Sequence, residues 1–170
     1  MKRKLSQIYT PYIIFILTFI IPLINTLSAE ETEITAPSYQ VKVVDGDSLE
    51  INSTRIRLQG IDAPEYTQTC KTSKKSPYSC GKNSIEYLKE LINNKTIKCI
   101  SHGQDQYKRE LCTCYADSIN INQELVKQGH AISYLSDEYQ EDETFAKKHQ
   151  LGIWQGDFIH PRLFRTLNNK

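Results

Sequence analysis

Residues 40–61 of the 170-residue chain read QVKVVDGDSLEINSTRIRLQGI, and this stretch decides the fold. Apolar and polar residues alternate along three short runs, as in strands with one buried face. The runs span residues 40–44, 48–51 and 54–61. The pair Asp45-Gly46 separates the first two runs and is a strong signal for a hairpin turn, and Asn52-Ser53 separates the next two. The stretch therefore predicts an antiparallel meander of three strands.

The rest of the chain predicts helices that alternate with further strands. Helical spacing of apolar residues is found in residues 83–93, 121–128 and 138–150, and strands are expected at 95–100 and 109–116. In the third helix we expect Tyr139, Phe145 and Ala146 to face inward. Polar segments predict loops at 66–80 and 101–108, and an irregular tail begins at residue 153. Five strands with three helices predict an α+β domain, a five-stranded Greek-key barrel of the OB type flanked by helices.

The first 29 residues have the three-part layout of a secretory signal peptide. Basic residues at positions 2–4 precede an apolar run over 12–24, and small residues follow up to Ala29. We expect cleavage after Ala29 and export, to the medium or the periplasm. The alternative is an uncleaved membrane anchor, because Leu27 occupies a position where a peptidase prefers a small residue.

The folded domain is expected to span residues 39–165, between a polar linker over 30–38 and a short tail over 166–170. The formal net charge of the chain is +1, and removal of residues 1–29 would take away three basic residues and no acidic one. The remaining protein would be slightly acidic. This excludes a protein that holds nucleic acid by bulk positive charge, so contact with a polyanion requires a local site and a bridging cation.

The five cysteines favour disulfides in an oxidising compartment. No Cys-x-x-Cys pair occurs and the four histidines are scattered, which argues against a structural zinc site. Cys70 and Cys80 would close a short loop, and Cys99 has two candidate partners, Cys112 and Cys114. One cysteine is left unpaired in either arrangement.

Four acidic residues lie near the predicted strands, two around Gly46 (Asp45 and Asp47) and two around Ala63-Pro64 (Asp62 and Glu65). In the meander these pairs can lie side by side, and carboxylates that converge repel one another unless a cation lies between them. Ligand sets made only of oxygen suit calcium or magnesium rather than zinc. The alternative interpretation is that Asp-Gly-Asp is only a turn.

Two arginines complete the candidate site. Arg57 lies in the third predicted strand, and Arg109 begins a later one. A guanidinium group binds phosphate oxygens with two parallel hydrogen bonds, so this pair is suited to gripping a phosphodiester. A lone arginine on a strand is also common as a simple surface charge.

Several motifs together resemble the thermonuclease (staphylococcal nuclease-like) family, in its exported bacterial type. They are VVDGDS at 43–48, RLQGIDAPE at 57–65, DQYKR at 105–109, the helix that begins near Asn122, and GIW at 152–154 followed by Pro161 and Phe164-Arg165. Members of this type often carry cysteines at the positions of Cys70, Cys80, Cys99 and Cys114, which makes these four the disulfide candidates.

The resemblance implies a calcium ion as cofactor. Its ligands would be the side chains of Asp47 and Asp62 and the backbone carbonyl of Ala63. Asp45 matches an acidic residue that lies behind these ligands.

The resemblance also assigns the catalytic residues. Arg57 and Arg109 would grip the scissile phosphate, and Glu65 would position or deprotonate the attacking water. Tyr107 and Tyr134 would line the nucleotide site. The chain departs from the family pattern just before Arg109, where Lys108 replaces a common glycine. If that position needs a positive φ, lysine fits it less well than glycine.

The implied activity is a calcium-dependent endonuclease that hydrolyses DNA and RNA, prefers single strands and leaves 3′-phosphates. We also consider a non-catalytic OB-fold module that binds nucleic acid, and a disulfide-stapled surface protein that binds calcium only for stability. Nothing in the sequence indicates a protein partner, and we expect a monomer.

Overall fold

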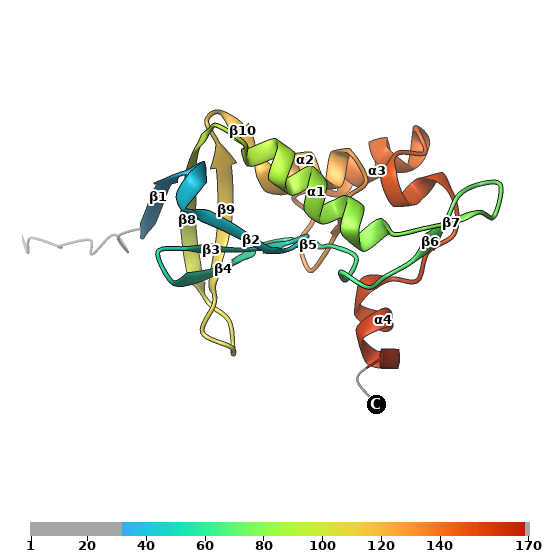
Figure 1. Ribbon diagram of the computed structural model, residues 1–170, viewed down its shortest axis with the longest axis horizontal. Coiled ribbons are helices and arrows are strands. Elements are labelled where there is room, and N and C mark those ends of the chain that lie inside the picture. The colour runs from blue at the N-terminus through green and yellow to red at the C-terminus, as the bar shows by residue number, and fades with distance from the viewer. Residues whose placement is uncertain (1–31, 169–170) are drawn as a thin grey trace, which may run out of the picture.

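A computed structural model describes residues 32–168, so the expected signal peptide lies outside the described residues. Its centre is a seven-stranded sheet that curls into half a barrel (Figure 1). The strand order is β1-β8-β9-β4-β3-β2, with β10 paired to β9. The strands are β1 Glu33–Pro37, β2 Val41–Asp45, β3 Ser48–Ile51, β4 Thr54–Leu58, β8 Thr96–Gln104, β9 Glu110–Ala116 and β10 Ile119–Asn120. The α+β class and the OB-type fold are thereby confirmed, but the main sheet has seven strands where five were expected, and the described residues form four helices where three were expected.

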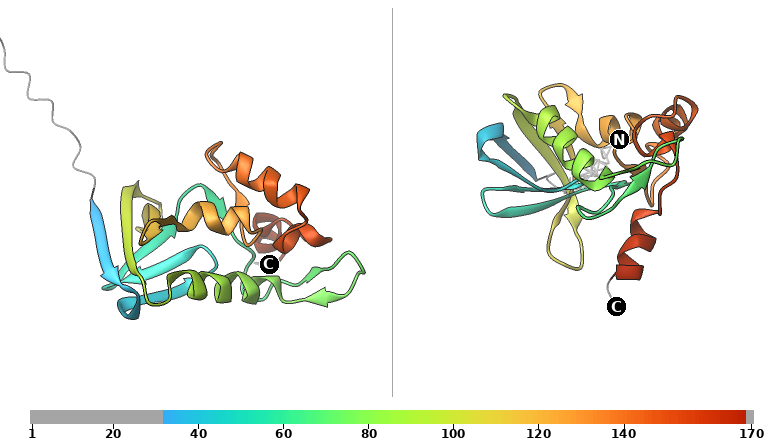
Figure 2. Two further views of the ribbon diagram at one scale, coloured as in Figure 1. Left: turned by 90° about the horizontal axis from the view of Figure 1, so that it is seen from above. Right: turned by 45° about the vertical axis from the view of Figure 1, so that its right-hand side comes forward.

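Four helices and two small sheets lie on one side of this half barrel (Figure 2). The helices are α1 Cys80–Ile92, α2 Ile121–Lys127, α3 Gln140–Lys148 and α4 Pro161–Asn168, with 3-10 turns η1 Ser38–Gln40 and η2 Gly152–Gln155. The small sheets pair β5 Ile61–Asp62 with β11 Ile132–Ser133, and β6 Cys70–Lys71 with β7 Pro77–Tyr78. None of the helices in residues 32–168 is both long and apolar enough to cross a membrane.

The predicted meander is present, and it supplies much of the core. Leu49 lies opposite Val43 on one side and Ile56 on the other, and Leu49 and Ile56 are fully buried. Strand β4 then pairs in parallel with β9, so that Arg57 lies beside Leu111. This parallel pairing joins the early acidic hairpin to the later strand that follows Arg109.

The linker and loop predictions were wrong at three places. Residues 33–37 form β1, because the open edge of β8 accepts a further strand and Ala36 is buried there. Strand β8 continues to Gln104, which shortens the expected loop 101–108. Within the expected loop 66–80, β6 and β7 form a small hairpin. These segments are polar, and pairing with a neighbouring strand determines their structure.

Two expectations for the C-terminal third were also wrong. Phe145 is 41% exposed, whereas Tyr139 and Ala146 do face the core. The expected irregular tail contains α4, which projects away from the body (Figure 1).

Gly129 follows the end of α2 and adopts a positive φ of +70°. A Cβ atom at this position would lie 2.3 Å from the carbonyl oxygen of Leu151, so only glycine allows this close approach.

The cysteines form two disulfides, Cys70–Cys80 and Cys99–Cys114. Cys99 and Cys114 are directly opposite one another on β8 and β9, which decides between the two candidate partners of Cys99. Cys112 is free and buried.

Candidate active site

The acidic hairpin between β2 and β3 is pressed against the segment that follows β5. A Cβ atom on Gly46 would lie 2.8 Å from the Cβ atom of Ala63, so the absence of a side chain permits this contact. The Ala63 N–H donates to Oδ2 of Asp47 at 2.9 Å, and the Ser48 hydroxyl donates to Oδ1 at 3.0 Å. Asp47 is thereby fixed beside the Ala63 backbone.

Arg57 joins the two acidic segments from β4. Its guanidinium group forms an ion pair with Asp47 and donates to Oδ1 of Asp62 at 3.2 Å. It also donates to the backbone carbonyl of Ile61 at 3.0 Å. The Arg57 side chain is 13% exposed and that of Asp62 is 0% exposed. Buried charges are tolerated only when paired, and Arg57 provides that pairing.

A second arginine reaches the same carboxylates from α4. Arg165 donates from Nη1 and Nη2 to the two oxygens of Asp62, both at 3.0 Å, and from Nη1 to Oε1 of Glu65 at 2.6 Å. Burial alone would lower the pKa of Arg165, but these bonds outweigh it and raise that pKa above its ordinary value. Sequence alone does not assign Arg165 to the site, because 103 residues separate it from Asp62 and 100 from Glu65.

Asp45 lies close to the same carboxylates. Burial raises its pKa to about 6, and the charges of Asp47 and Glu65 act in the same direction. The N–H of Gly46 donates to Oδ1 of Asp45 at 2.9 Å and opposes this shift. Asp45 therefore retains its proton to a higher pH than an ordinary aspartate does.

Two of the carboxylates, Asp45 and Glu65, line a cleft of about 820 Å³, and Asp47 and Asp62 are buried behind it. Its walls come from β4, the β8–β9 loop, the segment after β11, and α4, and Figure 1 shows that loop and α4 on the same side of the molecule. The lining residues are Asp45, Arg55, Glu65, Asp105, Gln106, Tyr107, Arg109, Leu111, Tyr134, Leu135, Arg162 and Arg165. The cleft thus contains Glu65, Arg109 and both predicted tyrosines.

Asp105 positions Arg109 at the cleft. Its Oδ2 accepts from Nε of Arg109 at 2.8 Å, and its Oδ1 accepts from the Arg109 backbone N–H at 3.0 Å. Within residues 32–168, the two Nη groups of Arg109 have no ion-pair partner. Lys108 adopts φ +60°, which is the left-handed conformation for which glycine is better suited. The backbone thus reaches the predicted geometry despite the lysine.

The Gln68 side chain forms a hydrogen bond with the backbone of Glu65, and the sequence analysis does not identify this residue. Its side chain is fully buried, its Oε1 accepts from the Glu65 backbone N–H at 3.3 Å, and its Nε2 donates to the carbonyl of Ile159 at 2.6 Å. Gln68 therefore connects the Glu65 segment to the chain just before α4. The only signal in the sequence is its position three residues after Glu65.

The candidate metal ligands around Asp47 and Asp62 are of the type that binds a hard cation. All are oxygens, which is the ligand type that calcium prefers, and two guanidinium groups now pair with their negative charge. In residues 32–168 no group of three His, Cys, Asp or Glu side chains is arranged to hold a metal. The predicted ligand set needs only two such side chains, since the third ligand is the backbone of Ala63. The assignment of ligands remains a prediction.

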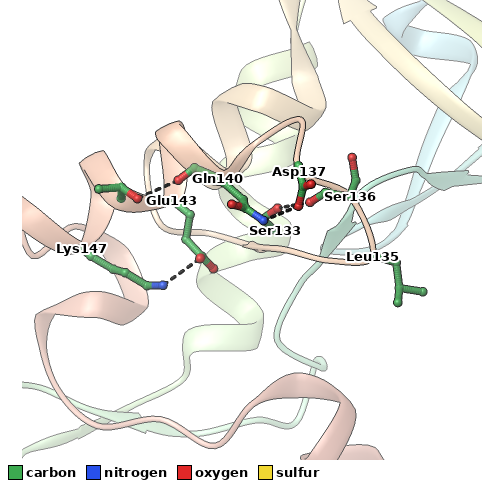
Figure 3. Close-up of a pocket in the computed structure, with 8 residues that line it drawn as sticks. Ser133, Leu135, Ser136, Asp137, Gln140, Glu143 and Lys147 are labelled. Carbon is green, nitrogen blue, oxygen red and sulfur yellow. Dashed lines mark hydrogen bonds and ion pairs between the residues drawn. The ribbon is translucent and has the colours of Figure 1, made fainter.

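A second depression, of about 450 Å³, lies between the segment after β11 and α3 (Figure 3). Lys147 is paired at 2.7 Å with Glu143, which lies one turn before it on α3. Asp137 adds another acidic group to its lining. Among the described residues that line this depression, no cationic side chain is free to bind a phosphate. We therefore place the candidate active site in the larger cleft.

Comparison with known proteins identifies a matching family. The sequence model described as "Staphylococcal nuclease homologue" matches residues 55–156. The chain is 33% identical over 126 residues to the succinoglycan biosynthesis protein ExoI of Rhizobium meliloti, a match that covers 71% of this chain and 66% of that protein. It is 32% identical over 125 residues to an uncharacterized endonuclease of Haemophilus influenzae, covering 67% and 64% respectively.

A third relative is covered more completely. The chain is 34% identical over 137 residues to an uncharacterized endonuclease of Escherichia coli O157:H7, and the match covers 74% of this chain and 82% of that protein. The chain spans slightly less than two thirds of the length of the other two relatives.

Proposed function

The chain belongs to the staphylococcal nuclease homologue family, and on this basis we propose that it is a nuclease that hydrolyses phosphodiester bonds in DNA and RNA. The observation that carries the proposal is the buried ion-pair cluster of Arg57, Asp47 and Asp62, which Arg165 connects to Glu65 in the cleft that also contains Arg109. Carboxylates can hold a cation that bridges to a phosphate, and neighbouring arginines can bind the phosphate oxygens directly.

We further propose calcium as the cofactor. Asp47, Asp62 and the Ala63 carbonyl would hold it, and when bound it would neutralise charge on the phosphate oxygens. Arg57 and Arg109 bind the scissile phosphate and stabilise the additional negative charge that develops during attack. Glu65 orients the attacking water and accepts its proton. The bond to the 5′ oxygen breaks, leaving a 3′-phosphate.

The cleft supports a single-stranded substrate. Tyr107 is 60% exposed beside Arg109, and Tyr134 lines the same cleft. Aromatic side chains stack on unpaired bases of any sequence, whereas a base inside a duplex is not available for stacking. Stacking on Tyr107 and Tyr134 makes no use of a 2′-hydroxyl, so both DNA and RNA are accepted. The protein acts as a monomer.

Export is part of the same proposal. Two disulfides are expected to persist only in an oxidising compartment, and they support secretion or periplasmic residence. In an anchored form the domain would face the same compartment.

The test is digestion of denatured DNA by the purified, disulfide-bonded protein in calcium and in excess chelator. We expect cleavage only with calcium. The variant Arg57→Ala should lose activity by about 10²–10³-fold, because one charge-stabilising group of the transition state is removed. Lys42→Ala is the matched control, since Lys42 is an exposed cation on β2 outside the cleft.

The alternative is a nucleic-acid-binding module without catalysis. The presence of Arg57, Glu65 and Arg109 together in one site argues against it. Binding of DNA without cleavage, by a folded protein loaded with calcium, would establish the alternative and refute the nuclease proposal.

A further inference from the structure

We propose that Arg165 acts as a built-in cation that closes the proposed calcium site, and that calcium binding displaces it and frees α4. The inference rests on the calcium site of the proposed function. It concerns a residue outside the predicted ligand and catalytic set.

The first argument is the occupancy of Asp62. Each carboxylate oxygen has two lone pairs. On Asp62, Oδ1 accepts from both Arg57 and Arg165, and Oδ2 accepts from Arg165. A calcium ion needs a carboxylate oxygen at roughly 2.3–2.6 Å. The fork of Arg165 covers both oxygens, and its charge repels an approaching cation.

Of the two arginines paired with Asp62, Arg165 is the more easily displaced. Arg57 is 13% exposed, lies inside the sheet, and also donates to the backbone carbonyls of Ile61 and Asp47. Arg165 is 34% exposed and its recorded hydrogen bonds go only to Asp62 and Glu65. Each arginine makes three hydrogen bonds, but displacing Arg165 breaks none to the backbone and leaves its more exposed guanidinium group free to enter water.

Helix α4 is attached to the body mainly at its N-terminal end. Gln68 holds the chain at Ile159, and Pro161 is buried. Beyond Pro161 every residue of α4 is exposed except Phe164 and Arg165, which are half-buried. Figures 1 and 2 show α4 standing out from the body. The ion pairs of Arg165 are therefore the main tether of the distal turn, and their loss would release it from residue 162 onward.

The first measurement is calcium affinity by isothermal titration calorimetry on the full protein. Arg165→Gln should bind calcium roughly tenfold more tightly than wild type, because the competing charge-assisted bonds of a partly exposed group are removed. Arg162→Gln is the matched control. It removes the same charge from the same helix, but Arg162 makes no ion pair within residues 32–168, so its affinity should change by less than about twofold.

The second measurement is hydrogen exchange of α4 with and without calcium. In wild type, calcium should speed exchange of residues 162–168. In Arg165→Gln this segment should exchange quickly in both conditions. The variant Arg165→Lys keeps the charge and loses the fork, so its calcium affinity should lie between those of wild type and Arg165→Gln.

Two outcomes would overturn the inference in different ways. If calcium binds wild type, Arg165→Gln and Arg162→Gln equally and leaves α4 exchange unchanged, the displacement is refuted while the proposed calcium site stands. If calcium binds neither wild type nor Arg165→Gln, the calcium site of the proposed function fails together with the inference.

Discussion

Lowering the pH from 7 to 5 should destabilise this protein through His130. The His130 ring stacks on Tyr87 with the ring centres 4.1 Å apart, and its backbone carbonyl accepts from the Ser84 hydroxyl. Burial lowers the pKa of His130 to about 4, from an ordinary value of 6.5. The imidazole is therefore neutral in the folded protein at any pH near neutrality.

The sign and size of the change in the free energy of unfolding follow from the pKa values of His130 in the folded and the unfolded state. Above pH 6.5 the His130 side chain is neutral in both the folded and the unfolded state, and its contribution to stability is fully present. Between pH 6.5 and 4 only the unfolded chain takes up the proton, so the free energy of unfolding falls. From pH 7 to pH 5 the loss amounts to about 2 kcal/mol.

The assay is urea unfolding at pH 7 and pH 5 for wild type and His130→Phe. Phenylalanine keeps a ring against Tyr87 and cannot titrate. The difference between the two pH values should be about 2 kcal/mol smaller in the variant than in wild type. His149→Phe is the control, because His149 is exposed and should leave the difference unchanged. An equal loss in wild type and His130→Phe would refute the reasoning.

Three further predictions concern other parts of the molecule. Asp105→Ala removes the carboxylate that orients Arg109, so steady-state cleavage of denatured DNA should fall by about tenfold or more, and an unchanged rate would show that Arg109 needs no such support. Burial raises the pKa of Cys112 to about 11, so iodoacetamide should label this thiol, as followed by mass spectrometry, only after unfolding. Replacing Cys70 and Cys80 by serine opens a ring with a sequence separation of 10 and should lower the free energy of unfolding in urea by about 3 kcal/mol, whereas a stability equal to wild type would contradict the chain-entropy estimate.

The meander and the acidic hairpin could be predicted because their signals are local. Alternation and the Asp45-Gly46 turn determine β2 and β3, and the short path from Asp47 to Asp62 brings these carboxylates together within one supersecondary unit. The left-handed backbone at Lys108 could be anticipated from the glycine that is common at that position.

The remaining features depend on contacts between distant segments. Strand β1 exists because β8 has an open edge, and nothing in residues 33–37 themselves indicates that neighbour. Arg165 enters the site through α4, whose place depends on the whole C-terminal path, including the bond between Gln68 and Ile159. Phe145 directly precedes the buried Ala146 and therefore lies at the margin of the buried face, where small errors in the predicted phase of a helix change the exposure of a residue.

The disulfide between Cys99 and Cys114 closes a covalent ring that contains the whole β8–β9 loop. Lys108 is exposed within this ring and is a natural target for a protease that cuts after basic residues. A single cut there would leave two polypeptides that remain one molecule until the disulfide is reduced. Both halves of the active site, the acidic cluster around Asp47 and the strand after Arg109, would stay attached through such damage.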